Sequence, residues 1–473
     1  MVFSSASFLI FFLPCLLVLY FLVPRRCRYL RNLVLLAFSL AFYACGGPKF
    51  LLLMLLSIAI NYAGGLLAGP VHRPRTRRLG MTLAVVLGLA LLGWFKYAGF
   101  FGEMLHALLP VVPVPQVTLP IGISFFTFQG LSYVIDVYRG DAAVQRDPLK
   151  LALYIAFFPQ LVAGPIVRYT TVAEEIDERH ESVSEFSAGA VRFLFGLGKK
   201  MLLANAVARI ADAAFAAVMP SVLFAWLGAV AYTFQIYFDF SAYSDMAIGM
   251  GLMVGFHYDE NFNYPYISGS IKEFWNRWHI SLGTFFRDYV YIPLGGNRKG
   301  ARRRTINLLI VWGLTGFWHG ASWNFIFWGL YFFLFIYMEN TFLLEKFSRL
   351  PRFVSHLYAM VVVYFGWVLF RCESLGNLGA ILKGMFGLNH NGFIDLSTSV
   401  LFQNNLYLLI FCIIASTPLL KNIGTYIKRL DLVHYRIPYL TYAYEIVIPP
   451  VLLILSLLAL VGNSYNPFLY FQF

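Results

Sequence analysis

The sequence is poor in charge for its length. Aspartate, glutamate, lysine and arginine make up 12% of its 473 residues and hydrophobic residues make up 59%. Soluble domains are about 25% charged, so a soluble protein of this length could not cover its surface with so few charges. The composition therefore predicts an all-α, polytopic membrane protein.

Common metal-binding and active-site motifs are also missing. The five cysteines form no CxxC pair, which argues against a zinc knuckle or a disulfide framework and favours inert, buried thiols. His180-Glu181 does not continue into HExxH, and neither a GxSxG elbow nor a P-loop occurs. The glycines Gly249, Gly251 and Gly255 lie in an apolar span and indicate helix packing rather than phosphate binding. We expect no metal site and no bound cofactor.

The charge that is present is mostly positive, with a formal net charge of +13. The positive residues lie in short loops between apolar spans, at 24–31, 70–78 and 287–304. This is the positive-inside pattern, so we expect these loops in the cytoplasm and the N-terminus outside. Contact with anionic lipid headgroups explains the charge more simply than binding of nucleic acid does.

Apolar runs long enough to be helices follow one another along the whole chain. About eleven crossings of roughly 20 residues each are expected. No polar linker and no internal repeat interrupts them, so we predict a single membrane-embedded domain, 1–473. The stretch 174–185 is acidic and looks the most soluble. The predicted spans are 7–23, 32–45, 50–69, 79–98, 120–137, 149–167, 190–218, 222–256, 305–338 (one or two elements), 354–370, 402–418 and 445–462.

The first candidate site residue is His279. It lies in 272–289, where aromatic and aliphatic residues recur at helical spacing, and this predicts one amphipathic helix at the membrane interface. On such a helix His279 faces the apolar side. It is either a site residue or an interfacial histidine bonded to a backbone carbonyl, and this segment alone leaves both open.

The second candidate is His319, which stands in an apolar run long enough to cross the membrane. An ionisable residue at that depth is costly and is a functional candidate. On a helix, Trp312, Thr315, His319 and Trp323 would share one face, and Gly313, Gly316 and Gly320 would form a neighbouring face for close packing. Such a histidine stays neutral and can act as a base, or it can hold two helices together.

Two aspartates also fall in an apolar span. Asp239 and Asp245 are six residues apart and face different directions on a helix. Each is a site group or the partner of a buried arginine, and the structural role is the favoured interpretation.

Longer ordered motifs run through the whole chain, and they are most specific from 237 to 329. With these motifs the chain resembles the membrane-bound O-acyltransferase family, in its bacterial alginate O-acetylation branch. Gly283 is a small departure, since many relatives carry serine there. The matching motifs are SFFTFQGLSYVIDVYRG (124–140), FFPQLVAGPIVR (157–168), YFDFSAYSD (237–245), NFNYPY (261–266), FWNRWHISLGTFFRDYVYIPLGGNR (274–298), GFWHGASWNFIFWG (316–329) and FLYFQF (468–473).

The resemblance implies a helical bundle with interfacial helices around a funnel or tunnel. It makes His319 the catalytic histidine and His279 a second histidine on the same path. Acetyl would come from a thioester, acetyl-CoA or an acyl-carrier protein, on the cytoplasmic side. Arg287, Arg298 and Lys299 are candidates to attract that anionic donor.

The implied partners are membrane lipids, a polysaccharide acceptor and a separate extracytoplasmic acetyltransferase. The implied location is the bacterial inner membrane. Two alternatives remain. One is a D-alanyl transferase for teichoic acid, which the long chain and the PLGGNR string disfavour. The other is a transporter or flippase, which would show repeats or rows of charge.

Overall fold

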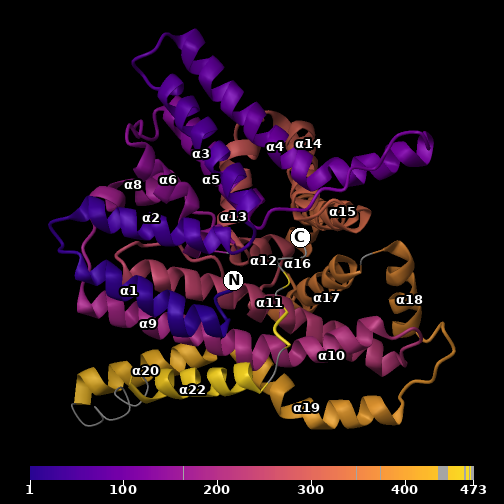
Figure 1. Ribbon diagram of the computed structural model, residues 1–473. Coiled ribbons are helices and arrows are strands. Elements are labelled where there is room, and N and C mark those ends of the chain that lie inside the picture. Colours follow the sequence, from indigo (N-terminus) through magenta and orange to yellow (C-terminus); the bar gives the residue numbers. More distant parts are fainter. Residues whose placement is uncertain are drawn as a thin grey trace. The chain divides into compact units, whose positions relative to one another are not determined.

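The computed structural model describes residues 1–473 except 163, 348, 373, 435–445, 463–464, 468 and 470–473. Across this part of the chain the regular elements are helices, and it contains no strand (Figure 1). The prediction of an all-α protein is confirmed. The chain divides into two compact units, and the prediction of a single domain stays a prediction.

The first unit contains residues 1–193 and 243–259. The helices are η1 (Phe8–Phe12), α1 (Leu13–Leu22), α2 (Arg28–Ala44), α3 (Pro48–Ala68), α4 (Pro74–Leu108), α5 (Ile123–Arg139), α6 (Pro148–Ala156), α7 (Phe158–Leu161), α8 (Tyr169–Asp177), most of α9 (Val183–Gly198) and the end of α11 (Val222–Met253).

The second unit contains residues 194–242 and 260–473. It holds both candidate histidines and most of the tryptophans. Besides most of α11, its helices are η2 (Lys199–Ala204), α10 (Asn205–Ala216), η3 (Pro265–Ile267), α12 (Ile271–Arg277), α13 (Ile280–Phe286), η4 (Arg287–Tyr291), α14 (Gly300–His319), α15 (Trp323–Met338), η5 (Glu339–Leu343), α16 (Leu344–Phe347), α17 (Arg352–Arg371), α18 (Leu375–Met385), α19 (Leu396–Ala415), α20 (Leu419–His434) and α22 (Ile448–Val461).

Among the residues described, six helices are long and apolar enough to cross a membrane. This confirms a multi-pass membrane protein, whereas the figure of about eleven crossings stays a prediction. Two shorter apolar helices, Phe8–Leu22 and Ile448–Val461, add to the six. The six are Pro48–Ala68, Pro74–Leu108, Val222–Met253, Trp323–Phe347, Arg352–Arg371 and Leu396–Ala415.

Three predicted spans are interrupted. The run 149–167 contains α6 and the short α7, with Pro159 in the first turn of α7, where a missing N–H is tolerated. The run 190–218 is divided by the π-helical turn η2, and 305–338 is two helices. Hydropathy records apolar length, and it does not record such breaks.

Both aspartates have a basic partner, as the structural interpretation of them expects. Arg192 Nη2 lies 3.0 Å from Asp245, and Lys200 Nζ lies 2.6 Å from Asp239. The partner of Asp239 is thus a lysine and not an arginine. Gly249 packs as predicted, because a Cβ there would lie 2.5 Å from the carbonyl oxygen of Gly189, whereas Gly255 lies beyond the end of α11 with φ 84°.

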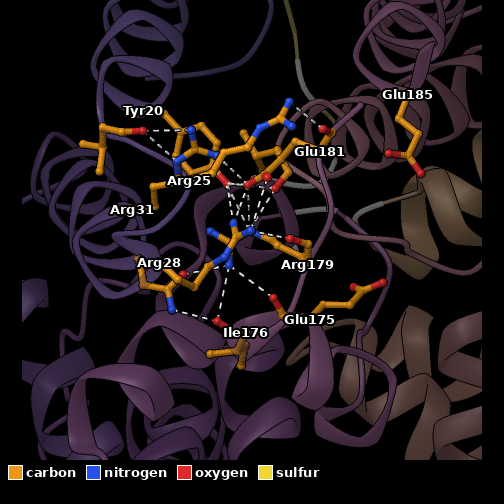
Figure 2. A network of polar contacts seen from close by, with 12 residues as sticks. Tyr20, Arg25, Arg28, Arg31, Glu175, Ile176, Arg179, Glu181 and Glu185 are labelled. Atoms are coloured by element: carbon orange, nitrogen blue, oxygen red, sulfur yellow. Dashed lines mark hydrogen bonds and ion pairs between the residues drawn. The ribbon is translucent and has the colours of Figure 1, made fainter. Parts of the chain in front are cut away.

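A network of arginines around Glu181 joins four segments of the first unit (Figure 2). The Glu181 carboxylate receives hydrogen bonds from Arg28 and from Tyr20 Oη, and Arg31 Nη1 lies 2.9 Å from it. Arg179 Nε donates to Tyr20 Oη and to the carbonyl of Val254, both at 3.0 Å. The network thereby ties the ends of α1, α2, α8 and α11 together.

The Glu181 side chain is 3% exposed, although it lies in the stretch that looked most soluble in sequence. Burial alone would raise the pKa of this carboxyl. Hydrogen bonds from Arg28 and Tyr20, with the charges of Arg28 and Arg31, outweigh burial and lower the pKa to about 2. The carboxylate is therefore charged at every physiological pH.

Replacing Glu181 with glutamine should lower the free energy of unfolding by about 3–5 kcal/mol, because it leaves buried guanidinium groups without their counter-charge. Thermal unfolding of the purified protein in detergent measures the change. Glu178→Gln, in the same loop but exposed, is the matched control. Since the pKa of Glu181 is depressed, its contribution is present above about pH 4.5 and is lost as the pH falls toward 2. Equal melting temperatures for the two variants would contradict the assignment.

Candidate active site

The segment predicted as one helix over 272–289 is broken at His279. Helix α12 ends at Arg277 and α13 begins at Ile280. Between them His279 has φ 45° and ψ 54°, the left-handed region that residues other than glycine rarely adopt. The prediction of a single amphipathic helix was therefore wrong. That His279 is buried, at 2% exposure, agrees with the apolar side predicted for it.

Contacts with residues 261–263 account for the break. The N–H of Ile280 donates to the carbonyl of Asn261 at 3.0 Å, and the N–H of Asn263 donates to the carbonyl of Arg277 at 2.9 Å. These bonds replace helical bonds on both sides of His279. They come from residues well outside the segment, so the periodicity of 272–289 could not reveal them.

The side chain of Asn261 also fixes the imidazole of His279. Asn261 Oδ1 accepts hydrogen bonds from Ser281 N–H at 3.2 Å and from Ser281 Oγ at 2.9 Å. The same oxygen lies 3.2 Å from His279 Nδ1, which must therefore donate and carry the proton. The imidazole lone pair is then on Nε2. Asn261 belongs to the NFNYPY motif, but its role was not predicted.

His279 lies outside the six long apolar helices, and burial lowers its pKa to about 3. The phenyl ring of Phe240 packs edge-on against it, with centroids 4.7 Å apart. Its imidazole is therefore neutral near pH 7 and accepts hydrogen bonds through Nε2 rather than carrying a charge.

The start of α12 is held by a residue that sequence reasoning missed. The carboxylate of Glu339, 2% exposed, accepts the N–H groups of Ile271 at 2.6 Å and Lys272 at 2.9 Å. Ser270 Oγ caps the same end by accepting from Glu273 N–H. The local Ser-x-x-Glu spacing signals the cap at Ser270, whereas nothing local signals Glu339.

His319 is the last residue of α14, and the chain is extended at Gly320. Trp323 does not share a helical face with His319 as predicted, because it begins the next helix, α15, and is 47% exposed. The rings around His319 belong to Trp318 and Trp328, each 4.9 Å away between centroids, and to Phe370 at 5.3 Å. His319 itself is buried, with 7% of its surface exposed.

Glycines set the spacing between α14 and α15. A Cβ on Gly316 would lie 2.3 Å from the carbonyl oxygen of Phe325, and one on Gly329 would lie 2.4 Å from that of Trp312. Close packing at Gly316 is thus confirmed. Gly320 faces the Phe325 ring, while Gly313 faces open space, so including it in the packing face was wrong.

The fold brings the two histidines to one indole. The ring centroid of Trp318 lies 6.1 Å from that of His279 and 4.9 Å from that of His319. The two histidines are 40 residues apart in sequence, on separate helical segments of the second unit.

A cavity of about 710 Å³ lies next to His279. Its lining includes His279, the indoles of Trp275, Trp278 and Trp312, and Thr315, one helical turn before His319. Three basic residues also line it, namely Lys272, Arg287 and Arg304.

The three candidate donor-attracting residues are placed differently. Arg287 lines the cavity, and its Nε lies 2.7 Å from Asp288 Oδ1. Arg298 and Lys299 are not among the lining residues.

Within the part of the chain that the structure describes, no three His, Cys, Asp or Glu side chains gather as a metal site would require.

Comparison with known proteins gives the family. The family model for membrane-bound O-acyltransferases matches residues 141–381. A probable alginate O-acetylase from Azotobacter vinelandii is 41% identical over the full length of both chains. A peptidoglycan O-acetyltransferase from Helicobacter pylori is 34% identical, covering 82% of this chain and 80% of its own. A teichoic acid D-alanyltransferase from Bacillus subtilis is 29% identical, covering 53% and 68%.

The chain belongs to the membrane-bound O-acyltransferase family. It is an O-acetyltransferase, and the resemblance to the alginate O-acetylation branch is confirmed.

The left-handed backbone at His279 can be tested with a pair of variants. His279→Gly should be more stable than His279→Ala by about 1 kcal/mol, because only glycine adopts positive φ without strain. Both variants remove the imidazole, so cavity formation largely cancels between them. Thermal unfolding in detergent gives the comparison. An alanine variant as stable as the glycine variant would show that residue 279 is not left-handed in solution.

Proposed function

We propose that the protein transfers acetyl from a cytoplasmic thioester donor to an extracytoplasmic polysaccharide of the alginate type, or to a partner transferase that acetylates it. The observation that carries the proposal is that His279 and His319 both pack against Trp318 and that His279 lines the cavity. The 41% identity to an alginate O-acetylase supports the acceptor class. The bacterial inner membrane, with loops 24–31, 70–78 and 287–304 in the cytoplasm, is the location that suits this reaction.

His319 acts as the general base. It removes the proton from the acceptor hydroxyl, whose oxygen forms a bond to the thioester carbonyl carbon. The carbon–sulfur bond then breaks, and the thiolate takes the proton from the imidazolium. The acetyl group ends on oxygen, and the free thiol leaves.

His279 has a different task because burial makes its imidazole a weak base. With Nδ1–H committed to Asn261, Nε2 is a hydrogen-bond acceptor. We assign to His279 the task of orienting the acceptor hydroxyl toward the thioester. The surrounding indoles exclude water, which would otherwise hydrolyse the thioester.

The donor is acetyl-CoA or an acyl-carrier thioester, and the protein holds no cofactor of its own. Both donors carry a phosphate-bearing pantetheine arm. The basic residues Lys272, Arg287 and Arg304 line the cavity that contains His279 and can neutralise that phosphate. Their placement favours entry of the donor through this cavity.

D-alanyl transfer is the second candidate within the family. The Bacillus subtilis teichoic acid D-alanyltransferase resembles only about half of this chain. The alginate O-acetylase resembles all of it, so acetyl transfer is favoured.

Substitution of His319 tests the base. His319→Ala should reduce acetyl transfer at least about a hundredfold. His319→Gln keeps hydrogen bonding but cannot accept a proton at neutral pH, so it should be equally inactive. The measurement is the acetyl content of the polysaccharide from an alginate-producing host that lacks its own O-acetylase, with membrane levels matched by immunoblot. Near-normal acetylation with the glutamine variant would end this assignment.

The lining of the cavity predicts that two pairs of basic residues contribute differently to donor binding. Arg287→Gln with Arg304→Gln should raise the acetyl-CoA concentration needed for half-maximal rate roughly fivefold or more, since a charged hydrogen bond contributes about 1.5–3 kcal/mol. Arg298→Gln with Lys299→Gln, outside the lining, should have a smaller effect that disappears at high salt. Inverted membrane vesicles with acetyl-CoA as the probe give both values. Equal effects of the two pairs would contradict donor binding in this cavity.

A further inference from the structure

A buried ion pair lies within the second unit, apart from the histidines. Lys200 and Asp239 are 1% and 3% exposed, and Nζ and Oδ1 are 2.6 Å apart. Asp239 lies in α11, one of the helices that can cross a membrane. Removing two charges from water at this depth costs several kcal/mol, so such a pair usually has a task beyond stability.

The two charged groups also bind the backbone of Pro467 and of Leu469. Residues 465–467 and 469 together are called the 465–469 segment below. Lys200 Nζ donates to the carbonyl of Pro467, and Asp239 Oδ2 accepts the N–H of Leu469 at 2.9 Å. Irregular backbone inside a membrane protein needs internal partners for its polar groups. The ion pair supplies one donor and one acceptor for that purpose.

Side chains of the same segment make further contacts. Asn205 Nδ2 donates to Asn466 Oδ1 at 3.1 Å, and Tyr465 Oη donates to Asp212. Leu469 is buried, at 5% exposure. The 465–469 segment is thus packed into the unit around the ion pair.

The residue after Asp239 contacts the candidate site. The Phe240 ring lies edge-on to His279 with centroids 4.7 Å apart, and it contacts Phe262 at 4.9 Å. Tyr237 lies 6.1 Å from Trp278, the residue before His279. This part of α11 is therefore the wall against which the strained His279 turn rests.

We propose that Lys200 and Asp239 are positioning residues for the transferase reaction. By joining η2, α11 and the 465–469 segment, they keep α11 in the place where Phe240 holds the His279 imidazole. The inference rests on the proposed function of His279. It adds Lys200 and Asp239, which act through α11 and contact neither the acceptor hydroxyl nor the thioester.

Two double variants separate positioning from plain stability. Lys200→Met with Asp239→Leu removes both charges and keeps apolar volume, but it also leaves the Pro467 carbonyl and the Leu469 N–H without these partners. The melting temperature should therefore fall only modestly, and acetylation is compared per amount of folded protein. The 465–469 segment and α11 are then no longer held. Because a 1 Å displacement can cost about 10²-fold in rate, acetylation in the complemented host should fall by roughly tenfold or more. Modification of His279 by diethylpyrocarbonate, read by peptide mass spectrometry, should become several-fold faster.

Lys200→Gln with Asp239→Asn is the conservative variant. It keeps one donor and one acceptor without charge, so acetylation and His279 reactivity should stay near those of the wild type. The control for removal of an ion pair is Arg349→Met with Glu345→Leu, whose side chains are 76% and 77% exposed. This control should change neither readout.

The outcomes are distinguishable. Normal acetylation and normal His279 reactivity in the Met/Leu variant would overturn the positioning role. A fall in acetylation that only follows the loss of folded protein would overturn it as well. If His319 variants stay active, the proposed function fails, whereas the reactivity of His279 still reports whether the ion pair holds α11.

Discussion

Polar groups buried away from water must find partners inside the protein, and the rest of this structure depends on that constraint. An isolated charge in such a place costs several kcal/mol or is neutralised, a carboxylate by gaining a proton and an ammonium group by losing one. Three buried carboxylates meet the requirement by reaching segments distant in sequence. Glu181 binds arginines from α2, Glu339 binds the first backbone amides of α12, and Asp239 binds Lys200 and the N–H of Leu469. Each contact that satisfies a charge therefore also fixes the position of a helix.

The two histidines are held by different means, and this difference separates their chemistry. His279 is fixed by a hydrogen bond to Asn261 and by a strained backbone, which together determine its tautomer and direction. His319 is surrounded by aromatic rings at the end of α14, one turn after the close approach of Gly316 to Gly329. If His319 is the base that we propose, a fixed acceptor at His279 would serve to guide a hydroxyl toward an acyl carbon.

Much of this arrangement follows from sequence alone. The shortage of charge predicted a helical membrane protein, and the cost of burying an imidazole selected His279 and His319. Periodicity gave one helix over 272–289 and placed Trp323 beside His319, and both were wrong. The breaks depend on tertiary contacts, such as the bonds from Asn261 to Ile280, that have no local pattern. The buried state of Glu181 was missed for the same reason, because its partners lie about 150 residues earlier.

That separation has a consequence for biogenesis. Arg28 is synthesised 153 residues before the carboxylate that neutralises it. At about 5–20 residues per second, roughly eight to thirty seconds pass between the synthesis of Arg28 and Arg31 and that of Glu181. During that interval water or lipid phosphates must solvate their guanidinium groups, which keeps this end of α2 at the bilayer surface. The order of synthesis thus keeps this loop at a membrane surface until the first unit can close.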